Sequence, residues 1–207
     1  MENEQFKIFD KDRNQIGIAT REEVHRHGYW HETFHCWFVS KEDDTNFLYF
    51  QLRSDTKKDY PNLFDITAAG HLLANETVED GVREIKEEVG IDISFRELVP
   101  LGIIDYCVEK ESFIDRELAN VFLYKSNKSF DDFTLQEEEV SGIVKVAFND
   151  FIKLWSGETE KIQVTGFTIQ KDGEQILIDE KVGRDKFVPH QLAFYETVIR
   201  KIREKIG

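Results

Sequence analysis

Three glutamates on one short stretch are the residues of this chain best suited to chemistry. Glu84, Glu87 and Glu88 lie within residues 70–91, which read GHLLANETVEDGVREIKEEVGI. On a helix, carboxylates three and four positions apart repel each other by about 0.2–0.5 kcal/mol per pair. A divalent cation removes that repulsion, and carboxylate oxygens suit Mg²⁺ or Mn²⁺ together with water and a substrate phosphate. We therefore expect these three glutamates to hold Mg²⁺ or Mn²⁺.

The helix that carries the glutamates is expected over residues 78–89. Thr77 followed by Asp80 is a capping-box pattern that begins a helix, and Gly90 favours a left-handed end. One face of the helix is apolar and the opposite face is acidic; the apolar residues are Val82, Ile85 and Val89. The alternative is an acidic helix that only faces water, because the chain has 41 acidic and 27 basic residues.

A longer pattern surrounds the glutamates. It begins with Gly70, continues with Glu76 and reads Arg-Glu-Ile-Lys-Glu-Glu-Val-Gly-Ile from Arg83 onward. This array resembles the Nudix box, whose pattern is Gly, a Glu six positions on, and then Arg-Glu-apolar-any-Glu-Glu-any-Gly-apolar. It departs at one point, since six residues separate Glu76 from Arg83 where the family usually has seven. A shortened turn over residues 77–81 could absorb the difference.

The resemblance covers about residues 5–155 and implies an α/β fold, the Nudix α/β/α sandwich with a mixed β-sheet. It also implies hydrolysis of a nucleoside diphosphate linked to another moiety, or of a related diphosphate. In such an enzyme the cation bridges diphosphate oxygens, neutralises charge at phosphorus and orients the attacking water. Arg83 is expected to pair with a box carboxylate rather than to touch the substrate.

Four of the six histidines lie within residues 25–35. Their spacing alone leaves two interpretations, either a transition-metal site or loop histidines that hydrogen-bond the backbone. The residues in question are His25, His27, His31 and His35.

A second resemblance, to type I isopentenyl-diphosphate isomerases with the Nudix fold, favours metal binding. It rests on residues 31–38 (HETFHCWF), on Ala69-Gly70-His71 and on the pair Asp115 and Glu117. In those enzymes histidines from an early loop, a strand start and a Gly-His step bind a metal together with two carboxylates. The implied ligands are His31, His71 and, as a third, either His25 or His27.

Asp115 and Glu117 lie two apart on an expected strand over residues 113–126, so both side chains share one face. On an exposed strand the pair has no role. Facing the box helix, Glu117 would be an additional carboxylate ligand or a general base that deprotonates water.

A basic loop over residues 53–61 interrupts an otherwise acidic chain. One interpretation is a solvated turn. The other follows from the isomerase resemblance, in which Arg53 and Lys57 align with residues that hold a diphosphate. Arg would contribute paired hydrogen bonds and Lys a point charge to phosphate oxygens.

Three functions compete. An isomerase moves a proton with a cysteine just before the Gly-His step, and here that position is Ala69, with Ala68 beside it. Alanine cannot move a proton, and the box glutamates are intact, so hydrolysis is favoured. The chain looks closest to the isomerase-like branch of the Nudix hydrolases, which includes the Nudix portion of certain plant fusion proteins. A non-catalytic module that only binds a nucleotide is the third possibility.

Composition excludes several classes of protein. The chain has 207 residues and a formal charge of −14, without the basic stripe that a nucleic-acid polymer requires. Two cysteines provide no disulfide framework. The sequence shows no signal peptide or long apolar run, so we expect a cytoplasmic protein without a membrane partner.

The elements that must position these residues are mostly strands. An opening hairpin is expected over 6–10 and 15–20, then a short helix from Arg21. Further strands are expected at 31–40, 46–53, 64–69, 98–108, 113–126 and 141–146, before a short helix capped by Asn149.

The last part of the chain changes character. Strands at 161–170 and 175–178 flank the turn Asp172-Gly173, and a helix follows over 190–206. The expected apolar side of this helix consists of Leu192, Tyr195, Val198, Ile199, Ile202 and Ile206. We predict a Nudix domain with an N-terminal hairpin over 1–157, and a hairpin and helix over 158–207 packed on it. The alternative for this helix is a homodimer contact.

Overall fold

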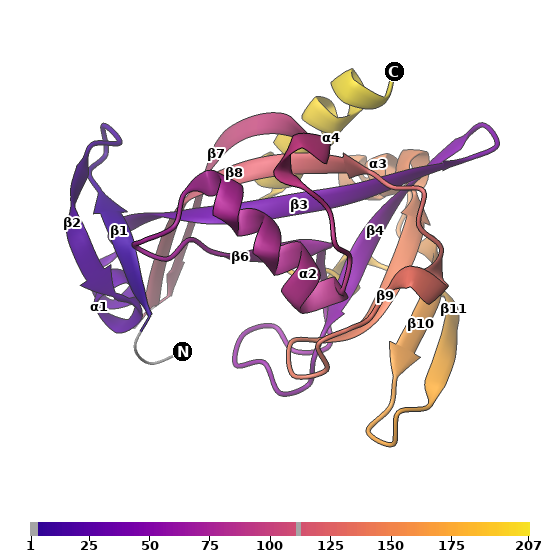
Figure 1. Ribbon diagram of the computed structural model, residues 1–207. Helices are drawn as coiled ribbons and strands as arrows, with labels where there is room; N and C mark the ends of the chain where they lie inside the picture. The colour runs from indigo at the N-terminus through magenta and orange to yellow at the C-terminus, as the bar shows by residue number, and fades with distance from the viewer. Residues whose placement is uncertain (1–3, 111–112) are drawn as a thin grey trace.

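The computed structural model describes residues 4–110 and 113–207, with the side chain of residue 110 left out (Figure 1). Its strands are β1 (Gln5–Phe9), β2 (Gln15–Thr20), β3 (Trp30–Glu42), β4 (Thr45–Arg53), β5 (Phe64–Ile66), β6 (Ala68–His71), β7 (Leu98–Lys110), β8 (Phe113–Lys125), β9 (Val140–Ala147), β10 (Ile162–Ile169) and β11 (Gln175–Val182). Its α-helices are α1 (Arg21–His27), α2 (Arg83–Val89), α3 (Phe148–Ser156) and α4 (Leu192–Ile206). Short 3₁₀ helices are η1 (Val78–Val82), η2 (Phe95–Glu97), η3 (Phe130–Asp132) and η4 (Arg184–Lys186).

The strands form one mixed sheet, as predicted. Its main path runs β11-β10-β9-β4-β3-β1-β2, with β5 on β4, β6 on β3 and β7 on β8. The pairing of β3 with β8 is parallel, and it places His31 beside Glu117. Two side chains that are far apart in the sequence therefore share one face of the sheet.

Helices cover both faces of this sheet, which confirms the α/β sandwich (Figure 1). Successive residues of β3 alternate between the two faces. Phe34, Cys36 and Phe38 pack toward α2 with Ile85 and Val89. Trp37 and Val39 pack toward α3 and α4. Because β3 is buried on both faces, residues 36–39 (CWFV) form a continuous apolar run.

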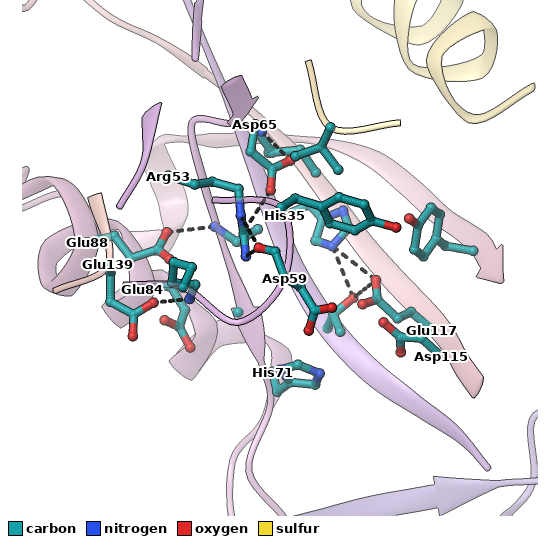
Figure 2. Close-up of a pocket in the computed structure, with 18 of the residues that line it drawn as sticks. His35, Arg53, Asp59, Asp65, His71, Glu84, Glu88, Asp115, Glu117 and Glu139 are labelled. Carbon is teal, nitrogen blue, oxygen red and sulfur yellow. Dashed lines mark hydrogen bonds and ion pairs between the residues drawn. The ribbon is translucent and has the colours of Figure 1, made fainter. Parts of the chain in front are cut away.

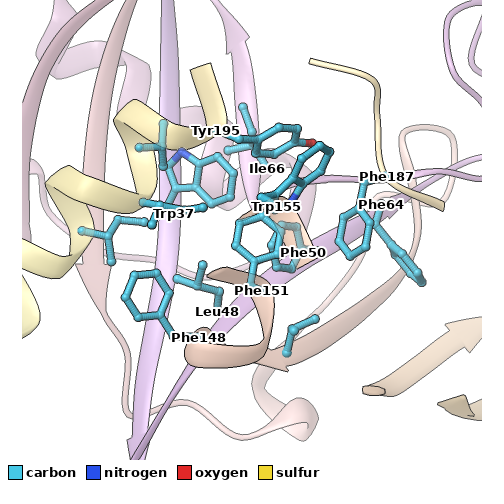
Figure 3. Packing of buried hydrophobic residues seen from close by; sticks show 14 of the residues in the cluster. Trp37, Leu48, Phe50, Phe64, Ile66, Phe148, Phe151, Trp155, Phe187 and Tyr195 are labelled. Atoms are coloured by element: carbon cyan, nitrogen blue, oxygen red, sulfur yellow. The ribbon is translucent and has the colours of Figure 1, made fainter. Parts of the chain in front are cut away.

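The larger core lies under α3 and α4 (Figure 3). Trp155 of α3 stacks on Tyr195 of α4 with ring centroids 3.9 Å apart. Tyr195 is 1% exposed, whereas Leu192, expected on the same apolar side, is 47% exposed. The division into residues 1–157 and 158–207 stays a prediction, since one core contains residues from both sides of it. Residues 1–3 and 111–112 of the predicted domain lie outside the described residues.

The expected helix over 78–89 is two elements, η1 and α2. The predicted capping box is present, because the Asp80 carboxylate accepts the Thr77 N–H at 2.8 Å. A 3₁₀ helix rises about 2.0 Å per residue against 1.5 Å for an α-helix, so fewer residues cover the same length. The 3₁₀ turn thus accommodates the missing residue between Glu76 and Arg83.

Two other boundaries were wrong. The expected strand over 64–69 divides at Thr67, because β5 pairs with β4 whereas β6 pairs with β3. At the division the Thr67 hydroxyl accepts the Phe38 N–H at 3.0 Å. The N-cap of α3 is Ala147 rather than Asn149, because β9 continues directly into the helix. Within the described ranges, none of the helices is long and apolar enough to cross a membrane.

Candidate active site

A cavity of about 450 Å³ opens between α2, the strands β3, β6 and β8, and the loop after β4. Figure 2 shows Glu84, Glu88 and Glu139 on one side and Asp115 and Glu117 on the opposite side. The predicted site residues that line it are Arg53, Lys57, His71, Glu84, Glu87, Glu88 and Glu117. His31, at 0% exposure, lies behind this surface.

One side of the cavity, here named the carboxylate end, consists of Glu84, Glu87 and Glu88. Glu88 is buried and accepts the Ala69 N–H at 2.9 Å and a Gln51 amide N–H at 3.3 Å. Glu87 is half exposed. Therefore the three predicted carboxylates share a helix but differ strongly in their access to water.

Gly70 leaves room for the carboxylate of Glu84. A Cβ at Gly70 would lie 2.2 Å from a Glu84 carboxylate oxygen, so the end of the Glu84 side chain would have to shift. The glycine that begins the box pattern therefore leaves room for the carboxylate that follows it on α2.

The carboxylate end carries more negative charge than its surroundings compensate. Burial raises the pKa of Glu84 to about 7, against the opposing effect of Arg83. Burial also raises the pKa of Glu88 to about 8, and repulsion from Glu84 adds to it. A divalent cation would remove both penalties, and the donor atoms are all oxygen, so these residues fit Mg²⁺ or Mn²⁺.

Arg83 holds the carboxylates in place, as the sequence predicted. Its guanidinium donates to Glu84 at 2.7 Å, to Glu87 at 2.9 Å and to Glu76 at 2.9 Å. It also donates to the His71 carbonyl at 3.1 Å. With its donors used in this way, Arg83 positions the acidic side chains and β6 rather than the substrate.

The opposite side, here named the histidine end, brings four side chains together. They are His25 of α1, His31 of β3, His71 of β6 and Asp115 of β8, and their ligand atoms all lie within 4.8 Å of one another. His25 is the third histidine, since His27 is exposed on the other side of α1. The Nε2 atoms of His25 and His31 each lie 3.5 Å from Asp115 Oδ1.

Backbone carbonyls fix two of the three imidazoles of the histidine end. His25 Nδ1 donates to the Arg21 carbonyl at 2.8 Å, and His31 Nδ1 donates to the Tyr29 carbonyl at 3.1 Å. A neutral ring then has an unprotonated Nε2, the form that binds metals. The His71 ring is held by stacking on the Phe6 ring, with ring centroids 4.8 Å apart.

Buried polar atoms of the histidine end lack hydrogen-bond partners. Among the described residues, His31 Nε2, His71 Nε2 and Asp115 Oδ1 have none. Burial lowers the pKa of both His31 and His71, which keeps them neutral. Three imidazoles and one carboxylate fit a divalent transition metal, whose binding would satisfy these atoms.

Glu117 lies beside Asp115 on the histidine side of the cavity (Figure 2) and has a partner that the sequence reasoning missed. Its carboxylate lies 3.3 Å from His35 Nε2 and accepts the Thr33 hydroxyl at 3.1 Å. Burial raises the pKa of Glu117, but the hydrogen bond and charge of His35 outweigh it and lower the pKa to about 2. The available signal was the strand period, since His31, Thr33 and His35 alternate onto one face.

The basic loop contributes two cations to the cavity, both already paired. Arg53 donates to Asp65 at 2.9 Å and to the Asp59 carbonyl at 2.9 Å. Lys57 forms an ion pair with Glu139, which belongs to the acidic run over residues 137–139. Contact of Arg53 and Lys57 with a diphosphate stays a prediction.

A third group of cavity residues was not predicted at all. Asp65, Tyr106 and His190 line the wall near Arg53. His190 comes from the segment before α4 and lies 125 positions from Asp65, which it contacts at 2.9 Å. No local pattern in the sequence connects residues so far apart.

Comparison with known proteins gives relatives of two kinds, Nudix hydrolases and isopentenyl-diphosphate isomerases. No family model matches the chain. It is 39% identical over 209 residues to an uncharacterized Nudix hydrolase of Clostridium acetobutylicum, covering 99% of each chain. It is 32% identical over 164 residues to Nudix hydrolase 3 of Arabidopsis thaliana, which covers 76% of this chain but only 21% of that protein. An isopentenyl-diphosphate Delta-isomerase of Corynebacterium diphtheriae is 31% identical over 147 residues, 67% of this chain and 76% of the relative.

Solved structures agree on the fold. The MutT protein of Methanosarcina mazei matches with a TM-score of 0.52 at 17% identity, covering 86% of this chain and 96% of the other. The NUDIX domain of Shewanella oneidensis NrtR, solved in complex with ADP ribose, matches with a TM-score of 0.50 at 11% identity, covering 85% and 88%. At such identities the likeness concerns architecture alone.

Proposed function

The chain belongs to the Nudix hydrolase family, and from this premise we propose that it hydrolyses the diphosphate linkage of a small nucleotide or related diphosphate. The proposal includes Mg²⁺ or Mn²⁺ at Glu84, Glu87 and Glu88. The observation that carries it is the pair of carboxyl groups of Glu84 and Glu88, which both line the cavity. Burial raises the pKa of both groups, so the ionised pair is unfavourable there without a cation.

Each residue of the carboxylate end then has a task. The bound cation would neutralise charge that builds at phosphorus and orient the attacking water. Arg83 keeps Glu84 and Glu87 in position through its 2.7 Å and 2.9 Å hydrogen bonds. Lys57 exchanges its pairing with Glu139 for a phosphate oxygen. Remaining N–H groups of Arg53 bind the diphosphate beside Lys57.

Glu117 has a different task in this proposal. A general base works best with a pKa near the working pH, and the pKa of Glu117 is lowered to about 2. We therefore assign Glu117 to holding His35 and to charge balance at the histidine end. There it is also the second carboxylate that the isomerase resemblance implies for the metal, rather than a ligand beside the box helix.

The second candidate function is isopentenyl-diphosphate isomerisation. It is supported by the histidine end and by the relative of that name. Against it stands Ala69, which offers only its N–H, bonded to Glu88. Among the described residues, neither Cys36, buried in the core under α2, nor Cys107 lines the cavity. The cavity therefore lacks the thiol that the isomerase reaction uses.

The test is ³¹P NMR of the purified protein with Mg²⁺ and a panel of diphosphates. The panel contains ADP-ribose, CDP, diadenosine polyphosphates, thiamine diphosphate and isopentenyl diphosphate. We expect new monophosphate or orthophosphate signals that disappear in Glu88→Gln and persist in Glu79→Gln, a matched change at an exposed position.

Three other outcomes would contradict the proposal. Unchanged phosphorus spectra with conversion of isopentenyl to dimethylallyl diphosphate would make the protein an isomerase. Binding without any turnover, weakened by Glu88→Gln, would make it a nucleotide-binding module. Equal turnover in Glu88→Gln would remove the carboxylate end from the reaction.

A further inference from the structure

Three side chains from distant parts of the sequence form a continuous hydrogen-bonded series in the cavity wall. Asp65 lies on β5, Tyr106 on β7 and His190 in the segment before α4. His190 Nε2 lies 2.9 Å from Asp65 Oδ1, and His190 Nδ1 lies 3.0 Å from the Tyr106 hydroxyl. All three residues line the cavity. Figure 2 shows Asp65 across the cavity from His71, away from both proposed metal sites.

The hydrogen-bond direction in this series is fixed from the Asp65 end. Asp65 also accepts from Arg53 at 2.9 Å and from the Ile66 N–H at 2.8 Å. Burial raises the pKa of Asp65, but His190 and Arg53 outweigh it and hold the pKa well below its usual range. A carboxylate only accepts, so His190 Nε2 donates and Nδ1 faces Tyr106.

Within the series, the Tyr106 oxygen keeps capacity to accept a further hydrogen bond. Both nitrogens of His190 are used, and both oxygens of Asp65 have partners. Tyr106 lies directly across from Glu117 in the β7–β8 ladder, so its side chain is on the face of the sheet that forms the cavity. The hydroxyl is therefore the atom of this series that a bound molecule would meet.

The path of the C-terminal segment does not depend on His190. The Val188 N–H donates to the Phe64 carbonyl at 2.9 Å, and the Tyr195 hydroxyl donates to the Val188 carbonyl at 2.8 Å. Phe187 and Tyr195, each 1% exposed, anchor the segment on both sides. Other residues therefore anchor the segment. The hydrogen bonds of the His190 imidazole go to Asp65 and Tyr106.

We propose that His190 is a positioning residue, which fixes the Tyr106 hydroxyl so that it hydrogen-bonds the group carried by the substrate's diphosphate. This inference rests on the proposed function. The carboxylate end would hold the diphosphate, and the Tyr106 hydroxyl would orient the remainder of the molecule from the opposite wall. A hydroxyl already held in one direction loses less freedom when the substrate binds.

The test compares steady-state kinetics of the full chain for His190→Ala, His190→Asn, Tyr106→Phe and the double variant His190→Ala/Tyr106→Phe. The substrate is the panel compound that the unmodified protein cleaves fastest. We expect His190→Ala to lower kcat/KM about three- to tenfold, mainly through KM, as for the loss of one hydrogen bond. In the Tyr106→Phe background the same change should have no further effect.

Two controls separate positioning from folding. His27→Ala, at an exposed histidine outside the cavity, should leave kcat and KM unchanged. His190→Asn places an amide near the position of Nδ1 and should restore part of the lost kcat/KM. If His190→Ala does not fold, as judged by thermal unfolding, His190→Asn is measured alone and in the Tyr106→Phe background.

The outcomes distinguish this inference from the proposed function. If the unmodified protein cleaves the substrate, Glu88→Gln does not, and the His190 variants lose nothing, the positioning role is overturned alone. An equal loss with and without the Tyr106 hydroxyl has the same meaning. If no panel compound is cleaved by the unmodified protein, both proposals are overturned.

Discussion

The two ends of one cavity offer two different sets of candidate metal ligands. The carboxylate end has oxygen donors on a helix, and Glu87 is half exposed. The histidine end has three imidazoles and Asp115; His31 is 0% exposed, and backbone carbonyls set the ring orientations of His25 and His31. Hard oxygen sites suit a cation that exchanges with water and substrate, whereas a buried nitrogen site suits one that stays.

The two ends differ because a helix and a sheet bring side chains together in different ways. A helix places Glu84, Glu87 and Glu88 close together by sequence spacing alone. The histidine end instead needs α1, β3, β6 and β8 to meet, and only the tertiary fold does that. The carboxylate end can therefore be predicted from a sequence motif, whereas the histidine end depends on how the strands and α1 pack.

The strongest test of the comparison is Glu88→Gln. We expect kcat to fall about 10²–10³-fold, because a ligand of the proposed Mg²⁺ and its charge are lost. Metal retained at the histidine end, measured by mass spectrometry after dialysis, should not change. A loss of metal at both ends would show that the two ends form a single site.

The reciprocal change is His71→Asn. We expect the affinity for a divalent transition metal to fall about 100-fold, since a direct ligand is lost where outer partners already cost 10–100-fold. His27→Asn is the matched control at an exposed histidine. The Mg²⁺ concentration that gives half-maximal hydrolysis should stay the same. If it rises with the loss of the second metal, the ends are coupled.

A smaller effect is expected from Gly70→Ala, which acts only on the carboxylate end. The new Cβ would lie 2.2 Å from the Glu84 carboxylate and force it to move. We expect kcat/KM to fall about tenfold, in line with a displaced electrostatic contact. Gly17→Ala is the control, because its Cβ would meet Ile8 at an ordinary 3.7 Å. Equal kinetics in the two variants would contradict the assigned place of Glu84.

The smallest effect concerns stability without metal. Glu84 and Glu88, with pKa values raised to about 7 and 8, bind protons more tightly in the folded than in the unfolded chain. The free energy of unfolding should therefore fall as pH rises, by about 1 kcal/mol between pH 7.5 and 9. For a chain of this size, a loss of 1 kcal/mol lowers the unfolding midpoint temperature by about 2–4 °C.

Three comparisons check that assignment. In this pH range the histidines of lowered pKa are neutral in both states, so they add little to the slope. Mg²⁺ and Glu88→Gln should each flatten the slope, whereas His71→Asn should keep it. A slope that persists in Glu88→Gln would contradict the raised pKa of the carboxylate end.

The sequence predicted features with local causes. The Asp172-Gly173 turn is present with Gly173 at φ 82°, the conformation that glycine adopts most easily. The Thr77 and Asp80 capping box is also present. Such signals need only a few consecutive residues, which explains why they were readable without the fold.

Other parts of the site have causes that no short segment contains. His35 could be placed on a strand, but its contact with Glu117 depends on the parallel pairing of β3 with β8. The choice of His25 over His27 depends on which side of α1 faces β8. His190 was expected only as the start of a helix, although its partner Asp65 lies 125 positions earlier.

The contact between Asp65 and His190 can form only after most of the chain has been synthesised. Proteins whose contacts join distant segments fold slowly, because long loops must close before those contacts form. During synthesis, α2 with Glu84 and Glu88 emerges long before residue 190. The larger core waits for Tyr195, Val198 and Ile202 of α4. A nascent chain therefore carries the box motif early but gains a complete cavity only when its last helix docks.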